Sequence, residues 1–332
     1  MKQFNLKKIW NPGVFQGEGK RKEYFEGWYF KIVDKEEKTA YAIIPGISIS
    51  KDPSKSHAFI MFSDARNHQM YYFKYSITDF GFNRDKFEIN IGKNLFNLNR
   101  IYLDLVNKKN KIKGQLEFNN IFPWPVTLFS PGVMGWYSFI PFMECYHGVL
   151  SFDHSIKGKI NINGEIKDFT GGKGFIEKDW GTSMPSSWIW MQTNHFEEEG
   201  VSLFGSIAKI PWLKNYFTGY IFGFLYKDTL YKFTTYNGAK INQLNVNKDF
   251  IELFVENKNY LLEINAKREK GVDLPAPLLG DMTAKVNETL SSKIKLKFYK
   301  KNKDKNKLIF SGIGRNAGLE FVGNIDELLD GL

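Results

Sequence analysis

The chain has 332 residues, enough for one large or two ordinary domains with a substantial core. Its formal net charge is +10, but the Lys residues stand in short Lys- and Asn-rich runs between apolar segments, and no recognised nucleic-acid-binding module accompanies them, so we expect no nucleic-acid partner. A single cysteine, Cys145, excludes an internal disulfide framework and fits a reducing compartment.

The N-terminal stretch, residues 1–10, begins with basic character but lacks the apolar region of a signal peptide. We therefore expect a cytoplasmic protein, which could also lie at an anionic lipid surface through its positive charge. A first strand is predicted at 25–33, with Glu26 and Trp28 on one face and Tyr29 on the other. An acid among aromatic side chains either keeps its proton, because burial disfavours the charged form, or pairs with a Lys or Arg. Both interpretations remain open for Glu26.

Short segments rich in Ile, Val, Phe and Tyr follow, separated by Asn, Gly, Asp or Lys, which is typical of an antiparallel meander. They lie at 40–44, 57–62, 70–77, 87–91, 101–106 and 112–118. No segment in this region has convincing helical periodicity.

The segment 121–143 contains no charged residue and is long enough to span a bilayer. Its four prolines and two glycines would break a helix repeatedly, which argues against a transmembrane span. We expect an irregular apolar segment. It either packs inside the protein or lies at a pocket mouth, where it touches a membrane or an apolar ligand.

Cys145 and His147 share a face of the next strand. Side chains two residues apart on a strand point in parallel, so a Cys/His nucleophile pair is disfavoured. His147 is either a hydrogen-bonding residue of a pocket or an ordinary buried histidine. The five histidines and one cysteine show no metal-ligand spacing, so we expect no metal site. Phosphate and dinucleotide loops are also absent from the sequence, and no cofactor is expected.

The stretch 171–196 carries the strongest candidate site. Two acids, Glu177 and Asp179, precede Trp180, and are interpreted either as functional carboxyl groups or as part of a surface turn beside Lys178. A strand predicted at 187–195 then places four side chains on one face: Trp188, Trp190, Gln192 and Asn194. Two indoles followed by two amides suit a pocket wall that is apolar at one end and hydrogen-bonding at the other, although Trp-rich strands also form ordinary cores.

A second run of strands follows the candidate site, and only the tail, 324–332, is typical of a short helix. These strands are predicted at 201–208, 217–226, 230–236, 250–256, 261–266, 293–299, 308–310 and 319–322. A single open sheet of so many strands would curl or split. The sequence therefore predicts an all-β protein of two antiparallel barrel- or sandwich-like domains, 1–168 and 169–332, with a short C-terminal helix.

Two motifs in this order resemble signatures of the tocopherol cyclase family: FEGWYFK at 25–31, and GFIEKDWG followed by a Pro and WIWMQTN at 174–194. Weaker echoes lie at 143–151, 274–282 and 317–323. The resemblance implies two lipocalin-like β-domains, related more distantly to carotenoid hydratases and Diels–Alder cyclases.

The same resemblance implies closure of a chromanol ring, in which the alkene of a prenylated quinol is protonated and a phenol oxygen captures the cation. Asp179, Glu177 or Glu26 would then donate the proton. The substrate would be held by Trp28, Tyr29, His147, Trp180, Trp188, Trp190, Gln192 and Asn194. The alternative is a non-catalytic carrier of a hydrophobic ligand, in which the acids merely pair with lysines.

Overall fold

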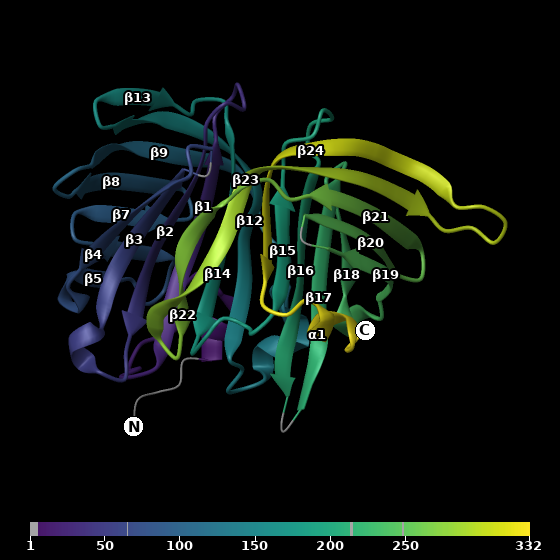
Figure 1. Ribbon diagram of the computed structural model, residues 1–332, viewed down its shortest axis with the longest axis horizontal. Coiled ribbons are helices and arrows are strands. Elements are labelled where there is room, and N and C mark those ends of the chain that lie inside the picture. The colour runs from purple at the N-terminus through teal and green to yellow at the C-terminus, as the bar shows by residue number, and fades with distance from the viewer. Residues whose placement is uncertain (1–5, 65, 213–214, 248) are drawn as a thin grey trace. The chain divides into compact units, whose positions relative to one another are not determined.

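The computed structural model describes residues 6–64, 66–212, 215–247 and 249–332, and most of them lie in β-strands (Figure 1). The chain forms two units. Unit 1 contains the chain up to Asp64, Gln69–Met184 and Leu274–Lys285. Unit 2 contains the turn that ends at His68, Pro185–Asp273 and Val286–Leu332.

Unit 1 is built on one antiparallel sheet in the order β4-β3-β2-β1-β14-β12-β9-β8-β7-β6-β5, with β13 paired to β12. Its strands are β1 (Tyr24–Val33), β2 (Ala40–Ile49), β3 (His57–Asp64), β4 (Gln69–Tyr75), β5 (Phe80–Phe82), β6 (Glu88–Ile91), β7 (Asn94–Asn97), β8 (Arg100–Val106), β9 (Lys111–Phe122), β12 (Cys145–Ile162), β13 (Glu165–Asp168) and β14 (Lys173–Gly181). Alternate residues of these strands form one aromatic-rich core that includes Trp28, Phe30, Phe96 and Phe118.

Short elements complete unit 1. They are η1 (Leu6–Trp10), η2 (Pro53–Lys55), η3 (Ile77–Asp79), η4 (Gly135–Phe139) and the paired strands β10 (Val126–Thr127) and β11 (Ser130–Pro131). The uncharged segment 121–143 is therefore irregular, as its prolines predict. No helix among the described residues is long and apolar enough to cross a membrane.

Unit 2 has its own antiparallel sheet in the order β18-β17-β16-β15-β24-β23-β21-β20-β19, with β22 paired to β23. The elements of this sheet and those that follow its strands are β15 (Trp188–Thr193), β16 (Ser202–Trp212), β17 (Asn215–Tyr226), β18 (Thr229–Thr234), η5 (Thr235–Asn237), β19 (Lys240–Val246), β20 (Phe250–Glu256), β21 (Tyr260–Lys267), β22 (Val272–Leu278), β23 (Asp281–Lys300), β24 (Lys307–Val322) and α1 (Asp326–Leu329). Most of β22 and the first residues of β23 belong to unit 1, which includes Leu274–Lys285. Ile189, Met191, Phe224 and Phe298 belong to the core of unit 2.

The predicted all-β architecture with a short C-terminal helix is confirmed. Several strands were not predicted. In unit 1 these include β5, β7, β13 and β14. In the second sheet, β19 is mostly polar, and β22 carries Pro275 and Pro277, which usually argue against a strand. The division of the structure differs from the predicted boundary at 168. β14 pairs with both β1 and β12, so it belongs to unit 1.

The register of β1, β14 and β12 assigns the candidate residues to two faces of the sheet. Directly paired residues share a face. Trp180 pairs with Glu26 and with Tyr146, and Lys178 pairs with Trp28, so these side chains lie on the inner face, towards the core of unit 1. The residues that alternate with them lie on the outer face: Asp179 paired with Gly27 and His147, and Glu177 paired with Tyr29 and Val149.

Position 174 requires glycine, because a larger side chain would clash with neighbouring atoms. A Cβ at this position would lie 2.3 Å from Nε2 of His154 and 2.9 Å from the carbonyl oxygen of Lys31. His154 cannot easily move, because it is buried and its Nδ1 is 2.8 Å from the Ser151 hydroxyl. Gly174→Ala should therefore destabilise the protein by about 1–3 kcal/mol in denaturant unfolding. Gly81→Ala is the control, since its Cβ would meet nothing closer than 3.9 Å. Equal stability of the two variants would contradict this account.

Candidate active site

The outer face of the unit 1 sheet carries a cluster of three titratable side chains, His147, Glu177 and Asp179. Nδ1 of His147 lies 2.7 Å from Oδ1 of Asp179, which is hydrogen-bonding distance. Nε2 of the same ring lies 3.6 Å from Oε2 of Glu177, a close charge contact without a hydrogen bond. The two carboxyl groups thus lie next to opposite nitrogens of one imidazole. Strand alternation places Glu177 and Asp179 on the same face of β14, and the pairing with β12 brings His147 to that face.

Charge determines the protonation of this cluster. Burial alone would lower the pKa of His147, but the Asp179 charge, its hydrogen bond and the Glu177 charge outweigh burial and raise the pKa to about 9. At neutral pH the imidazole therefore carries the proton, between two carboxylates. The sequence pointed to a protonated carboxyl group as the acid; the geometry adds His147 as a further candidate.

Cys145 lies beside the cluster but does not have the properties of a nucleophile. Its Sγ is 4.0 Å from Oδ1 of Asp179. Burial, together with the charges of Asp179 and Glu144, raises the pKa of the thiol well above its ordinary value. A thiol that stays protonated is a poor nucleophile, which agrees with the sequence-based reasoning against a Cys/His pair.

Glu26 lies on the inner face and forms a buried ion pair. Its Oε1 is 2.5 Å from Nζ of Lys178, and its carboxylate also accepts hydrogen bonds from the backbone of Gln16 and Gly17 and from the Tyr24 hydroxyl. Both charged side chains are fully buried. This is the cation-paired interpretation of Glu26. The Glu26 carboxyl group is thus engaged by Lys178 on the inner face, whereas the His147 cluster lies on the outer face.

Lys178 completes that network with its other two donors. Its Nζ donates to the carbonyl oxygens of Pro12 (2.8 Å) and Val14 (2.6 Å), and it lies 4.8 Å from the ring of Trp28 and 4.5 Å from the ring of Trp180. Burial lowers the pKa of Lys178 to about 8, although the Glu26 charge opposes this shift. The Glu26–Lys178 pair therefore holds the segment that contains Pro12 and Val14 against the inner face of the sheet.

The aromatic side chains predicted to bind substrate in unit 1 have different surroundings. Trp28 is a core residue, stacked on Phe87 at 5.8 Å, and its Nε1 donates to the Gly13 carbonyl. Trp180 is only partly buried and stacks on Tyr146 with a centroid distance of 5.6 Å. Tyr29 shares the outer face with Glu177, its cross-strand partner, and is mostly buried.

In unit 2, the four residues predicted to line a pocket wall share one face, as the alternation requires. Ile189 and Met191 point into the core of unit 2, so Trp188, Trp190 and Gln192 point away from it, as does Asn194 just beyond the end of β15. All four are buried. These residues belong to unit 2, whereas the His147 cluster belongs to unit 1.

The sequence reasoning missed the acidic partners of these tryptophans. Nε1 of Trp188 donates to Oε2 of Glu320 at 2.7 Å, and the register pairs Glu320 with both Trp190 and Glu288. Glu288 is fully buried. The signal for Glu320 was present in the family echo at 317–323, but a single acid in a distant strand gives no indication of its partner.

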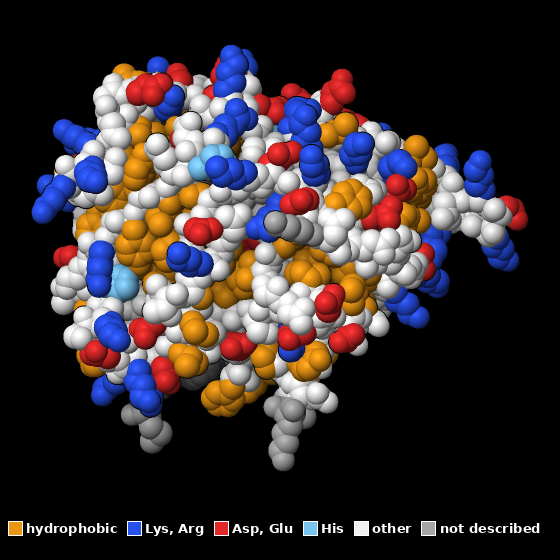
Figure 2. All heavy atoms as spheres, in the orientation of Figure 1, with side chains coloured by type: hydrophobic (Ala, Val, Ile, Leu, Met, Phe, Trp, Pro, Cys, Tyr) orange, Lys and Arg blue, Asp and Glu red, His pale blue; other side chains and the backbone are white. Residues whose placement is uncertain are grey.

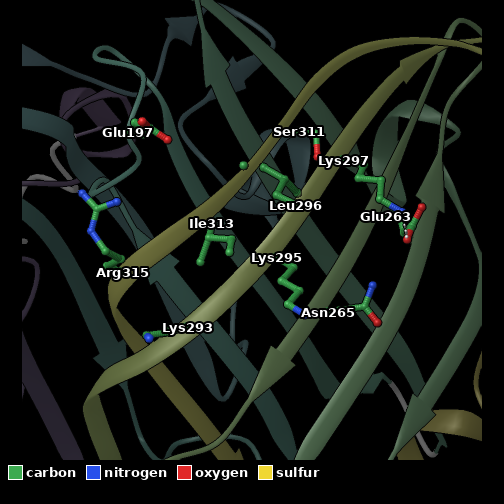
Figure 3. Close-up of a pocket in the computed structure, with 11 residues that line it drawn as sticks. Glu197, Glu263, Asn265, Lys293, Lys295, Leu296, Lys297, Ser311, Ile313 and Arg315 are labelled. Carbon is green, nitrogen blue, oxygen red and sulfur yellow. Dashed lines mark hydrogen bonds and ion pairs between the residues drawn. The ribbon is translucent and has the colours of Figure 1, made fainter.

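Two of the grooves on the described residues contain no predicted site residue. One, of about 600 Å³, lies on β21, β23 and β24 (Figure 3). In it Lys297 pairs with Glu263 at 2.9 Å, and its lining also includes Glu197, Lys293, Lys295 and Arg315. The other, of about 650 Å³, is lined by Asn11, Asn97, Asn99, Arg100 and Asn119 among others.

Figure 2 shows Lys and Arg spread over the visible face and interspersed with Asp and Glu, without one basic patch. No three His, Cys, Asp or Glu side chains of the described residues are grouped as metal ligands.

Two solved structures share the fold at low sequence identity. The crystal structure of CghA with Sch210972 superposes with a TM-score of 0.54 and 8% identity, over 90% of this chain and 89% of that one. A putative AttH from Nitrosomonas europaea gives a TM-score of 0.51 and 11% identity, over 90% and 92%. At such identity, the likeness shows the fold alone.

Sequence comparison identifies the family. A probable chloroplastic tocopherol cyclase from Oryza sativa subsp. japonica is 28% identical over 217 residues, which cover 61% of this chain and 45% of that protein. The chloroplastic tocopherol cyclase of Zea mays is 26% identical over 197 residues, covering 57% and 41%. The alignments thus span less than half of these relatives. The profile described as tocopherol cyclase-like matches residues 97–323, about two thirds of the chain. The chain therefore belongs to the tocopherol cyclase-like family.

Proposed function

We propose that the protein closes a chromanol ring on a prenylated quinol by proton transfer, with no cofactor taking part. The observation that carries this proposal is the His147–Asp179–Glu177 cluster, in which an imidazole with a raised pKa lies between two carboxyl groups, within the residues that the family profile matches. Such a cluster holds an acid and a base side by side.

The chemistry needs both partners. One proton is added to the side-chain alkene, a bond forms between the phenol oxygen and the tertiary carbon, and the phenol loses its proton, so substrate and product are isomers. We assign the donated proton to His147 and the removal of the phenol proton to Glu177. Asp179 would keep the imidazole oriented through Nδ1. Once His147 has given up its proton, the negative charges of Asp179 and Glu177 would offset the positive charge that develops on the tertiary carbon.

Aromatic faces would stabilise the cationic carbon by roughly 0.5–2 kcal/mol each. Tyr29 is the aromatic residue of unit 1 best placed for this role, because it shares the outer face with Glu177, whereas Trp28 and Trp180 lie on the inner face. Trp188, Trp190, Gln192 and Asn194 stay proposed substrate-binding residues.

The test is incubation with a hydroquinone that carries a prenyl chain ortho to one hydroxyl, in D₂O, followed by mass spectrometry. Wild type should give the chromanol with one solvent deuterium on the carbon next to the new C–O bond. His147→Gln should lower kcat by about 10²–10⁴-fold. His68→Gln replaces an exposed histidine and should leave turnover unchanged.

Two results would overturn the proposal. Turnover that survives in His147→Gln, Asp179→Asn and Glu177→Gln would rule out the cluster as the acid. If wild type binds the quinol tightly but forms no cyclised product, the protein is instead a carrier of a hydrophobic ligand. The Glu26–Lys178 ion pair fits that alternative equally well.

A further inference from the structure

The most exposed large apolar side chains of unit 1 gather in one part of the chain, 126–142, which we name the apolar loop. Phe142 is 98% exposed, Phe129 80% and Leu128 66%, and Trp136 and Phe139 are also exposed. The sequence from 121 to 143 contains no charged residue. Monomeric soluble proteins seldom present such a group of apolar side chains to water without a binding role.

The loop is held in place by specific contacts. Nε1 of Trp10 donates to the Leu128 carbonyl at 3.1 Å, and the Trp10 ring packs edge-on against Phe139 at 5.5 Å. The Tyr146 hydroxyl donates to the Ile140 carbonyl and accepts from the backbone of Met143. The outward direction of the exposed rings is therefore set by the fold.

We propose that the apolar loop inserts its exposed side chains into the surface of a lipid bilayer that contains anionic lipid. Rings that protrude almost completely, like Phe142 and Phe129, suit the headgroup–acyl boundary, whereas a protein partner would need a pocket for each. Trp136 and Tyr137 are the residue types that favour this boundary. Insertion would stop at side-chain depth, because the irregular backbone cannot enter the hydrocarbon. The net charge of +10 favours anionic lipid.

The loop also adjoins the candidate active site. Sδ of Met134 accepts a hydrogen bond from the backbone of His147 at 3.1 Å, and Tyr146, which holds Ile140, stacks on Trp180. A docked loop would thus bring the bilayer close to His147. Delivery of a prenylated substrate by this route rests on the proposed function; docking itself does not.

The test is flotation of the full chain with vesicles of phosphatidylcholine, with and without phosphatidylglycerol. Wild type should float with the anionic vesicles and lose binding in part as salt is added. The double variant Phe129→Ser/Phe142→Ser should bind at least about tenfold more weakly, since each phenyl ring contributes apolar area. The matched control is Val106→Ser/Ile166→Ser, which removes two exposed apolar side chains of unit 1 at 61% and 64% exposure outside the loop. Because all four side chains are exposed, melting temperatures should be unchanged.

Failure of wild type to float, or equal binding by both double variants, would overturn the docking proposal. So would self-association of wild type that Phe129→Ser/Phe142→Ser abolishes, because the loop would then be a protein interface. Turnover separates the two proposals. The loop variant should keep wild-type activity on a short-chain quinol in solution and lose activity on a long-chain quinol in vesicles. Absence of turnover in wild type would contradict the proposed function and leave the flotation result intact.

Discussion

Lys178→Met should lower the free energy of unfolding of unit 1 by about 3–5 kcal/mol, the usual cost of removing one partner of a buried ion pair. The substitution leaves the Glu26 carboxylate fully buried without its cation and removes the donors to the Pro12 and Val14 carbonyls. Denaturant unfolding followed by tryptophan fluorescence measures the loss, since Trp28 and Trp180 lie against the lysine.

Two controls separate burial from charge. Glu26→Gln/Lys178→Met removes both charges of this pair, so the double variant should recover part of the lost stability. Lys159→Met removes one partner of a salt bridge to Asp168 at the surface, where the lysine is 63% exposed, and should hardly change stability. If Lys178→Met and Lys159→Met unfold alike, the inner-face network does not stabilise unit 1 as described.

Asp179→Asn should lower the pKa of His147 from about 9, because the charge and the charged hydrogen bond that oppose burial are both removed. Under the proposed function the imidazole must be protonated, so wild-type turnover should fall as the pH rises through about 9. In Asp179→Asn this decline should begin at lower pH, with a large loss of activity at pH values where wild type is still fully protonated. Glu177→Gln should shift the decline less, since its oxygen is 3.6 Å from the ring and makes no hydrogen bond to it.

NMR titration of the His147 ring measures this pKa without any substrate. The sign of the linked stability follows from the same shift. The folded pKa lies above the ordinary value of 6.5, so the contribution of His147 to stability is complete below about 6.5 and is lost as the pH rises through about 9. An unchanged His147 pKa in Asp179→Asn would show that Asp179 does not raise the pKa of His147.

Local patterns in the sequence predicted most of the fold, because strand alternation and turn residues are local properties. The alternation in 187–195 correctly separated Trp188 and Trp190 from Ile189 and Met191. It could not predict which strands become neighbours. β14 pairs between β1 and β12, over sequence separations far longer than any local pattern, and this pairing shifts the division between the units beyond 168.

The sequence named candidate acids of the site but could not predict how they are arranged. Glu26, Glu177 and Asp179 were grouped as possible acids, but the register places Glu26 on the inner face and the other two on the outer face. Lys178 stood between the two acids in sequence and was interpreted as their neighbour, whereas alternation turns it towards Glu26 and Trp28. Only the pairing of β1 with β14 reveals that partner, and only the pairing of β12 with β14 brings His147 to Asp179.

The register of β14 has an evolutionary consequence. Because successive side chains of this strand serve the ion pair on one face and the imidazole cluster on the other, a one-residue insertion or deletion would exchange the two sets of side chains. Lys178 would then be turned out of the core and Asp179 into it, so that both networks would fail together. Residues 173–181 can therefore diverge by replacement at single positions while the length of the stretch stays fixed.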